Sequence, residues 1–463
     1  MLTRERKIIR QGGIAAIGHM AGSILTGLTA LLLSRALEPS EFAIYALCIS
    51  INGVLRIIGR CGINAGLLAQ NCEPTKEEYE TGLTVMVALS TVAATIGSFA
   101  MPWFARFSNV RDLVGPGIVT ALLLPIHALP LTAITRMERQ LRFRPMVIIE
   151  LLTQVVGYAV GIFLAFKGAG VWGPIAGSAL RAVLYAILPW MVVGGESIGF
   201  CWDRVIALRL IRFGVGYVVA TASVQCRTLA FLSLTGKFIG TDATGILALS
   251  LRAVTLAAPV RAAAARVVLP SLAPIVNSPR ILKRAIRIAV ETEVLLSVPI
   301  LALAVVALNF IVVHFSRNGW ALTATLFPAI AAGAILSAAH AATLTALYVK
   351  GRFVEPVLSS LAHIAILTVV LAGCGSNFGI DACGIAAVLV WPAAWIVEWG
   401  GRRVLGTEWS RDGVIWALAG AASLLAWLYG TGLVVISFAI FVLTRRAIIL
   451  RAGKIVSAFL PAK

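Results

Sequence analysis

The chain has 463 residues, of which 59% belong to the apolar AVILMFWYC set and only 13% are charged. Its mean hydropathy is +0.94, and apolar runs of about 20 residues, each long enough to cross a bilayer, recur from end to end. This composition excludes a soluble protein. The net charge of +19 does not indicate nucleic-acid binding, because most basic residues lie in short segments between apolar runs, where they orient membrane helices.

The apolar runs predict an all-α, polytopic membrane protein with about 14 transmembrane helices. The first run is too long for the apolar core of a signal peptide, so it is expected to be an uncleaved span. The expected spans are residues 14–33, 42–69, 81–104, 118–134, 147–166, 171–193, 213–234, 243–269, 294–315, 322–349, 356–372, 380–397, 414–429 and 433–443.

Basic residues gather in alternate connections between these spans. Segments 135–146 and 278–287 hold four each, whereas no connection on the opposite side holds more than two. This asymmetry predicts a multi-pass protein of the inner (plasma) membrane with both termini in the cytoplasm. The two basic segments are also expected to form short interfacial helices, because apolar residues alternate with the charges.

An internal repeat relates the two halves of the chain. A shift of about 202 residues places KIIRQG at 7–12 on RLIRFG at 209–214, and six spans lie between equivalent points. An even number of spans keeps the halves in the same orientation, so the repeat is parallel. The predicted domains are an N-terminal lobe (residues 1–205, spans 1–6), a C-terminal lobe (206–404, spans 7–12) and a terminal helix pair with a basic tail (405–463).

Sequence motifs for ATP or metal binding are missing. There is no GxxxxGK[ST] or HExxH sequence and no Cys/His cluster at metal spacing. We therefore expect neither an enzyme nor a cofactor or metal site. The five histidines are far apart, and His19 on the first span is the candidate for proton coupling.

The expected spans carry arginines. At the bilayer centre each would cost about 3 kcal/mol if it faced lipid, so the side chains must face the protein interior. The deeper residues are Arg56, Arg60, Arg181, Arg227 and Arg252, and Arg261 and Arg266 lie nearer the cytoplasmic end of the eighth span.

Two interpretations of these arginines remain open. Buried ion pairing needs carboxylates at the same depth, and no acidic residue lies near the middle of any expected span. A water-filled cationic cavity that attracts an anion is favoured, and guanidinium groups match phosphate oxygens in pairs. Two parallel lobes around such a cavity describe an alternating-access transporter. The expected substrate-binding residues are Arg56, Arg60, Arg227 and Arg252, with Arg181 auxiliary.

Three stretches carry a family resemblance. LLLSRALEPSEFAIYAL (31–47), GINAGLLAQ (62–70) and MERQLRFRPMVIIELLTQVVGYAVGIFLAFKGAGVWGPIAG (137–177) resemble Wzx-type polysaccharide flippases. These belong to the multidrug/oligosaccharidyl-lipid/polysaccharide (MOP) exporter superfamily. The resemblance implies two six-helix lobes in a V and a C-terminal helix pair. It also implies transport of a polyprenyl-pyrophosphate-linked oligosaccharide to the outer leaflet, as part of polysaccharide or lipopolysaccharide biosynthesis.

The resemblance also bears on residues and partners. Related flippases hold the pyrophosphate with arginines on the second and eighth spans, where this chain has Arg56 or Arg60 and Arg252. Family members often carry an acidic residue in the seventh span, where this chain has Gln225, Cys226 and Arg227. Possible partners are a polysaccharide polymerase and chain-length or export proteins. The alternatives are a cation-coupled multidrug antiporter on the same fold, which requires buried carboxylates, and a membrane glycan polymerase or ligase, which usually has a large outer loop.

Overall fold

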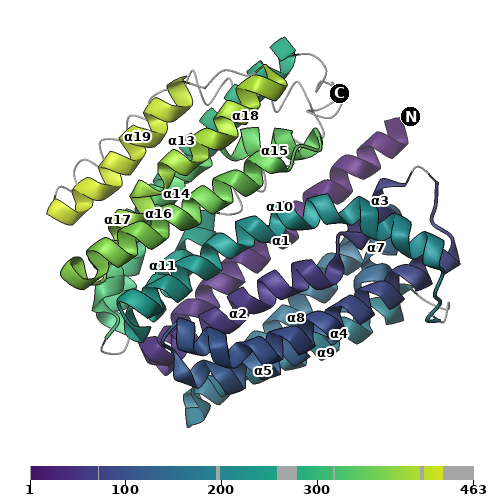
Figure 1. The fold of residues 1–463 in the computed structure, drawn as a ribbon, viewed down its shortest axis with the longest axis horizontal. Coiled ribbons are helices and arrows are strands. Elements are labelled where there is room, and N and C mark those ends of the chain that lie inside the picture. Colours follow the sequence, from purple (N-terminus) through teal and green to yellow (C-terminus); the bar gives the residue numbers. More distant parts are fainter. Residues whose placement is uncertain are drawn as a thin grey trace. The chain divides into compact units, whose positions relative to one another are not determined.

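The protein is all-α, as predicted. The computed structural model describes residues 2–70, 72–193, 199–257, 279–315, 319–406 and 411–430, and within these ranges helices and their connections account for the chain, with no strand (Figure 1). Long apolar sequences fold this way in a bilayer because a helix satisfies its own backbone hydrogen bonds.

The chain divides into two compact units, Met1–Ala248 and Leu249–Lys463. The first contains the following helices: α1 (Leu2–Ala36), α2 (Pro39–Arg60), α3 (Ile63–Ala69), α4 (Lys76–Phe107), η1 (Arg111–Leu113), α5 (Val114–Leu122), α6 (Leu124–Ala128), α7 (Leu131–Arg139), α8 (Phe143–Leu164), η2 (Ala165–Ala169), α9 (Trp172–Val193), α10 (Arg204–Phe238) and most of α11 (Thr241–Val254).

The second unit starts in the last turns of α11. It then contains η3 (Thr255–Ala257), α13 (Pro279–Phe315), α14 (Ala321–Ala338), α15 (Ala341–Val349), α16 (Val354–Phe378), α17 (Asp381–Leu389), η4 (Trp391–Ala394), α18 (Trp395–Leu405), α19 (Arg411–Ala426) and η5 (Trp427–Tyr429).

The described residues contain fewer candidate membrane spans than the sequence predicts for the full chain. Among the described residues, ten helices are long and apolar enough to cross a membrane, and an eleventh span results if the bent pair Arg111–Ala128 and Leu131–Arg139 is counted as one. The expected span 433–443 and the second half of 243–269 lie outside the described residues. The count of fourteen is therefore not confirmed.

The order and length of the helices repeat along the chain. Helices α1 and α10 each hold 35 residues, and they begin and end 202 residues apart. Helices α2 and α11 also begin 202 residues apart. The repeat found in the sequence thus extends to the helices. The division into compact units follows a different boundary, because α10 packs against α2, α3 and α4. The lobe boundaries at 205 and 404 stay predictions.

Several expected spans are interrupted rather than continuous. Residues 118–134 form α5, α6 and α7, and the second break bends the chain by 42°. Pro125 and Pro130 stand at the starts of α6 and α7, where a missing N–H costs no helical hydrogen bond. Residues 322–349 and 380–397 are also interrupted, at Ala339–His340 and at Val390.

The expected interfacial helices do not form as separate elements. Residues 279–287 are the first turns of the 37-residue helix α13. Residues 135–146 are divided between the end of α7 and the start of α8, on either side of Leu141, whose φ is 54°. The apolar positions that suggested an interfacial stripe continue into transmembrane helices instead.

Helix α10 joins the first unit through close backbone contacts. Cys61 and Gly62, between α2 and α3, both have positive φ (46° and 65°). A Cβ atom added to Gly214 of α10 would lie 1.8 Å from the Cys61 carbonyl oxygen. Glycine at this position of α10 is therefore required by the contact with the α2–α3 connection.

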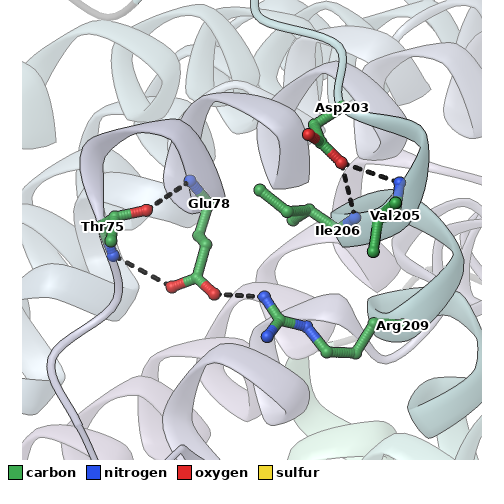
Figure 2. A network of polar contacts seen from close by, with 6 residues as sticks. All are labelled: Thr75, Glu78, Asp203, Val205, Ile206 and Arg209. Atoms are coloured by element: carbon green, nitrogen blue, oxygen red, sulfur yellow. Dashed lines mark hydrogen bonds and ion pairs between the residues drawn. The ribbon is translucent and has the colours of Figure 1, made fainter.

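A polar network joins the starts of α4 and α10 (Figure 2). Thr75 and Glu78 form a capping box, in which each side chain accepts a hydrogen bond from the other residue's backbone N–H. The second oxygen of Glu78 pairs with Arg209, one turn after Asp203 caps α10 through the N–H groups of Val205 and Ile206. The Glu78 carboxylate thus caps the start of α4 and also pairs with Arg209 on α10.

Candidate functional site

Polar side chains follow one face of α2. Asn52, Arg56 and Arg60 are four residues apart, so they leave the helix on the same side. The Asn52 side-chain amide donates a hydrogen bond of 2.7 Å to the Thr120 carbonyl oxygen on α5. This face of α2 is therefore turned toward the segment that contains α5 and α6.

The two arginines lie at the end of a helix, which differs from the prediction. The apolar run 42–69 predicts one span with both charges near its middle, but α2 ends at Arg60 and the chain turns at Cys61 and Gly62. The positive φ of two successive residues breaks the run, and neither apolar pattern nor hydropathy reports φ. Cations at a helix C-terminus are stabilised by the partial negative charge of the last carbonyl groups.

Arg181 on α9 approaches the same region. Together with Arg56 and Arg60 it forms what we call the arginine cluster, because its charge is close enough to Arg56 to repel it. The Arg181 guanidinium carbon also lies 6.0 Å from the centre of the Tyr158 ring on α8, within the range of a cation–π contact.

Two further side chains lie within electrostatic reach of the arginine cluster. His127 on α6 is close to all three arginines, and Tyr185 on α9 is close to Arg60 and Arg181. Glu138 and Glu150 lie close to Tyr185 and to each other. The cluster itself is thus built from α2 and α9, with His127 of α6 beside it, all within the first unit.

The arginine cluster has unsatisfied donors. In the part of the chain that the structure describes, none of its three guanidinium groups forms a hydrogen bond or an ion pair with the protein. The Arg56 Nε atom is buried and has no acceptor. Three neighbouring cations without a carboxylate partner repel one another and attract an anion. This arrangement favours a cationic site over buried ion pairing.

The other two predicted arginines are not part of this cluster. Arg227 lies on α10 in the first unit, where it is half-buried, and Arg252 lies in the last turn of α11 in the second unit. Gln225, two residues before Arg227, is near α2, because a Cβ atom added to Gly53 would lie 2.8 Å from its side-chain nitrogen. The roles of Arg227 and Arg252 stay predictions.

The remaining candidates are placed only in part. His19 lies on α1 with an exposed side chain, and its carbonyl oxygen accepts a hydrogen bond from Ser23. Its role in proton coupling stays a prediction. Arg261 and Arg266 lie outside the described residues. Among the described residues, no group of His, Cys, Asp and Glu side chains is arranged to hold a metal ion.

Sequence reasoning missed the polar residues around Arg181. On α8, the Gln154 amide donates to the Gly22 carbonyl oxygen at 3.0 Å and to the Thr26 hydroxyl at 2.9 Å, and Thr26 lies 3.1 Å from the Tyr158 hydroxyl. Gln154 and Tyr158 are four residues apart on α8. Two polar residues four positions apart within an apolar run indicate a polar helix face, and this pattern could have identified them from the sequence.

Comparisons with known proteins identify a family and a fold. A family described as "Polysaccharide biosynthesis protein" matches residues 32–324. The succinoglycan biosynthesis transport protein ExoT of Rhizobium meliloti (strain 1021) is 24% identical over 221 residues, which are 45% of this chain and 42% of that protein. The chain therefore aligns with less than half of that relative's length.

Solved structures share the whole fold. The lipid II flippase MurJ in an inward closed conformation superposes with a TM-score of 0.71 at 13% identity, over 95% of this chain and 99% of that one. The multidrug transporter DinF-BH gives a TM-score of 0.57 at 17% identity, over 87% and 97% of the two chains. At these identities the similarity concerns the fold alone.

Proposed function

The chain belongs to the polysaccharide biosynthesis protein family, and from that premise we propose that it moves a polyprenyl-pyrophosphate-linked oligosaccharide from the cytoplasmic to the outer leaflet. Family and fold make it a membrane transporter of the MOP type. The observation that supports this particular cargo is the arginine cluster, whose guanidinium groups form no hydrogen bond or ion pair with the described residues.

The chemistry of the cluster suits a diphosphate. Each guanidinium presents paired N–H donors that match two oxygens of a phosphate. Two phosphates carry enough charge to offset the repulsion between Arg56, Arg60 and Arg181. In this proposal, Arg227 and Arg252 complete the grip during alternating access, while the prenyl chain stays in the lipid.

The proposal also specifies the membrane, the orientation of the chain in it and the expected partner proteins. The distribution of Lys and Arg supports an inner-membrane protein with both termini in the cytoplasm. The cargo arises from synthesis on the cytoplasmic face, so a polymerase and chain-length or export proteins are the expected partners. The family and neighbours favour a transporter over an enzyme.

The cation-coupled multidrug antiporter is less well supported. A cationic drug needs a buried carboxylate near its path. Neither residues 13–36 of α1 nor the whole of α10 contain Asp or Glu, whereas the arginine cluster repels cations. A resistance phenotype on overexpression would favour the antiporter.

Substitution of the cluster tests the proposal. We expect Arg56→Gln and Arg181→Gln each to lower polysaccharide export by about tenfold or more, because a hydrogen bond to a charged group contributes about 1.5–3 kcal/mol. In cells that produce only the variant, the lipid-linked glycan should accumulate on the cytoplasmic leaflet, as in cells that lack the gene.

The control is Arg106→Gln, which removes an exposed arginine at the end of α4. This variant should export normally. The amount of inserted protein and its thermal unfolding in detergent should match the wild type for all three variants. Normal export by both cluster variants would contradict the proposed role of the arginine cluster.

A further inference from the structure

A second polar site lies in the second unit, where two interrupted spans meet. His340 stands between α14 and α15, and Trp391 begins η4, directly before α18. The Trp391 indole nitrogen lies 3.0 Å from His340 Nε2. His340 Nδ1 lies 3.0 Å from Glu398 Oε1, and the Thr343 hydroxyl donates to the same oxygen at 2.9 Å.

The direction of each hydrogen bond in this network follows from which groups can donate and which can accept. An indole nitrogen can only donate, so His340 Nε2 must accept and the ring proton sits on Nδ1. Nδ1–H and the Thr343 hydroxyl therefore both donate to Glu398 Oε1. The network orients the carboxylate and leaves its other oxygen, Oε2, without a hydrogen bond to the described residues.

The site is buried inside the second unit. The His340 and Glu398 side chains are 4% and 8% exposed. An ionised carboxylate is costly at this depth unless a cation neutralises it. The donors to Glu398 are the His340 ring and the Thr343 hydroxyl, and no Lys or Arg among the described residues is paired with it.

The surrounding helices carry few other charges. Helices α13, α14, α15, α16 and α17 pack on each other or on the segment η4–α18. Helix α14 and η4 contain no titratable group, and Arg402 and Arg403 of α18 are exposed. The buried and half-buried titratable groups of the other helices are Lys283, Glu291, Glu293, Tyr348, Glu355, His363, Cys374 and Cys383.

A second buried carboxylate, Glu355 of α16, packs against α18 at Gly400. The Cγ atom of Glu355 would be 2.6 Å from a Cβ atom added to Gly400. Arg352 holds one Glu355 oxygen at 2.8 Å, and the other is buried without a partner. Glu293 is also buried. The three fully buried carboxylates among the described residues all belong to this unit.

We propose that Glu398 is a proton-binding site, oriented by His340, Thr343 and Trp391, through which a proton gradient is coupled to transport. The proton adds to a lone pair of Oε2, and the carboxylate becomes a neutral acid; no other bond changes. Neutralisation removes the cost of burying the charge, so loaded and unloaded sites favour different packing of the interrupted spans. The inference rests on the proposed transport function but concerns a different unit from the arginine cluster.

The first test needs no substrate. Purified protein is acidified in steps, and the infrared carbonyl band of a protonated carboxylic acid is followed. The wild type should gain a band that Glu398→Gln lacks and that the control Glu291→Gln, which removes a carboxylate paired with Arg287 at 2.7 Å, retains. Thr343→Val should move the midpoint of this band, because it removes one donor to Oε1.

The second test uses export and a defined probe. Glu398→Gln should reduce export to the level of cells without the protein, while inorganic pyrophosphate should still raise its unfolding temperature as in the wild type. Arg56→Gln should lose that protection and keep the infrared band. Proton binding at Glu398 and diphosphate binding at the arginine cluster would then be lost in different variants.

Each contrary result has its own meaning. An identical band in wild type and Glu398→Gln, together with normal export, would overturn the proton site. Stabilisation of the wild type by sodium but not by choline, absent in Glu398→Gln, would also overturn it and assign a metal cation instead. If Glu398→Gln does not fold, an unchanged midpoint in Thr343→Val contradicts the proposal. Failure of pyrophosphate to protect the wild type, with the band intact, would count against the proposed cargo alone.

Discussion

Individual arginines in this protein have two different environments. Those of the arginine cluster form no hydrogen bond or ion pair in the described structure, whereas Arg139 donates several hydrogen bonds. Its two terminal nitrogens donate to the carbonyl oxygens of Leu67, Leu68, Gln70 and Cys72 at 2.8–3.2 Å. Arg139 thus satisfies the end of α3, where carbonyl groups have no intrahelical partner, whereas the guanidinium groups of the cluster keep unsatisfied donors.

Removal of Arg139 should affect stability. We expect Arg139→Met to lower the free energy of unfolding by about 2 kcal/mol, because four carbonyl groups at and after the end of α3 lose a charged donor. Thermal unfolding in detergent measures the loss, and Arg142→Met, which removes an exposed arginine three residues on, serves as the control. Equal unfolding temperatures for both variants would show that the four contacts are not stabilising.

The sequence revealed part of each site. The four-residue spacing of Arg56 and Arg60 correctly predicted a shared face, since it follows from helical geometry alone. Their position at a helix end could not be predicted, because it depends on the positive φ of Cys61 and Gly62. The partnership of His340 and Glu398 was also missed, since these residues are far apart in sequence and only the fold brings them together.

At the scale of helices, the protein relies on close backbone approaches. Helices α8 and α9 approach at glycines, and a Cβ atom added to Gly177 would lie 2.2 Å from the Gly157 carbonyl oxygen. Helix α10 approaches the α2–α3 connection at Gly214 in the same way. Small residues allow such contacts in membranes, where apolar burial does not drive helices together.

Substitution of Gly214 on α10 gives the clearer test of these backbone contacts. We expect Gly214→Ala to destabilise the protein by about 1–3 kcal/mol, because the added methyl group meets a carbonyl oxygen that cannot rotate away. The control is Gly373→Ala on α16, where an added Cβ meets nothing within 4 Å and helix propensity favours alanine. The unfolding temperature should fall for the first variant and not for the second.

Helix existence was easier to predict than helix continuity. Hydropathy located the apolar segments because each must match the bilayer thickness. It merged α2 with α3, α14 with α15 and α17 with α18, since an interruption of a few residues leaves the mean hydropathy high. These interruptions carry both proposed sites: Arg60 directly precedes one, His340 lies in another and Trp391 follows a third.

Taken as a whole, the described part of the molecule holds buried charges of opposite sign in different units. The arginine cluster belongs to the first unit, and the fully buried carboxylates Glu293, Glu355 and Glu398 belong to the second. An anionic cargo and a coupling cation would therefore have separate binding units. Their linkage would be a coupling free energy between distinct sites rather than competition for one site.

The orientation of the whole chain gives a further prediction. In a protein without native cysteines, Gln140→Cys between α7 and α8 should react with an impermeant thiol reagent only from the cytoplasm. Asn109→Cys between α4 and η1 should react only from outside, because one expected span separates it from the basic connection 135–146, which stays in the cytoplasm. Both residues are exposed. Labelling in intact cells and in inverted vesicles measures the two sides, and the reverse pattern would contradict the predicted topology.

The place of α10 has a consequence for how the protein is made. Helices α2 and α3 leave the ribosome early, yet the backbone around Gly62 is covered by a helix that begins only at Arg204. A nascent chain that has reached α9 therefore presents an open glycine surface within the bilayer. The insertion machinery must keep this surface available until α10 emerges, because the first unit is completed only by its last long helix.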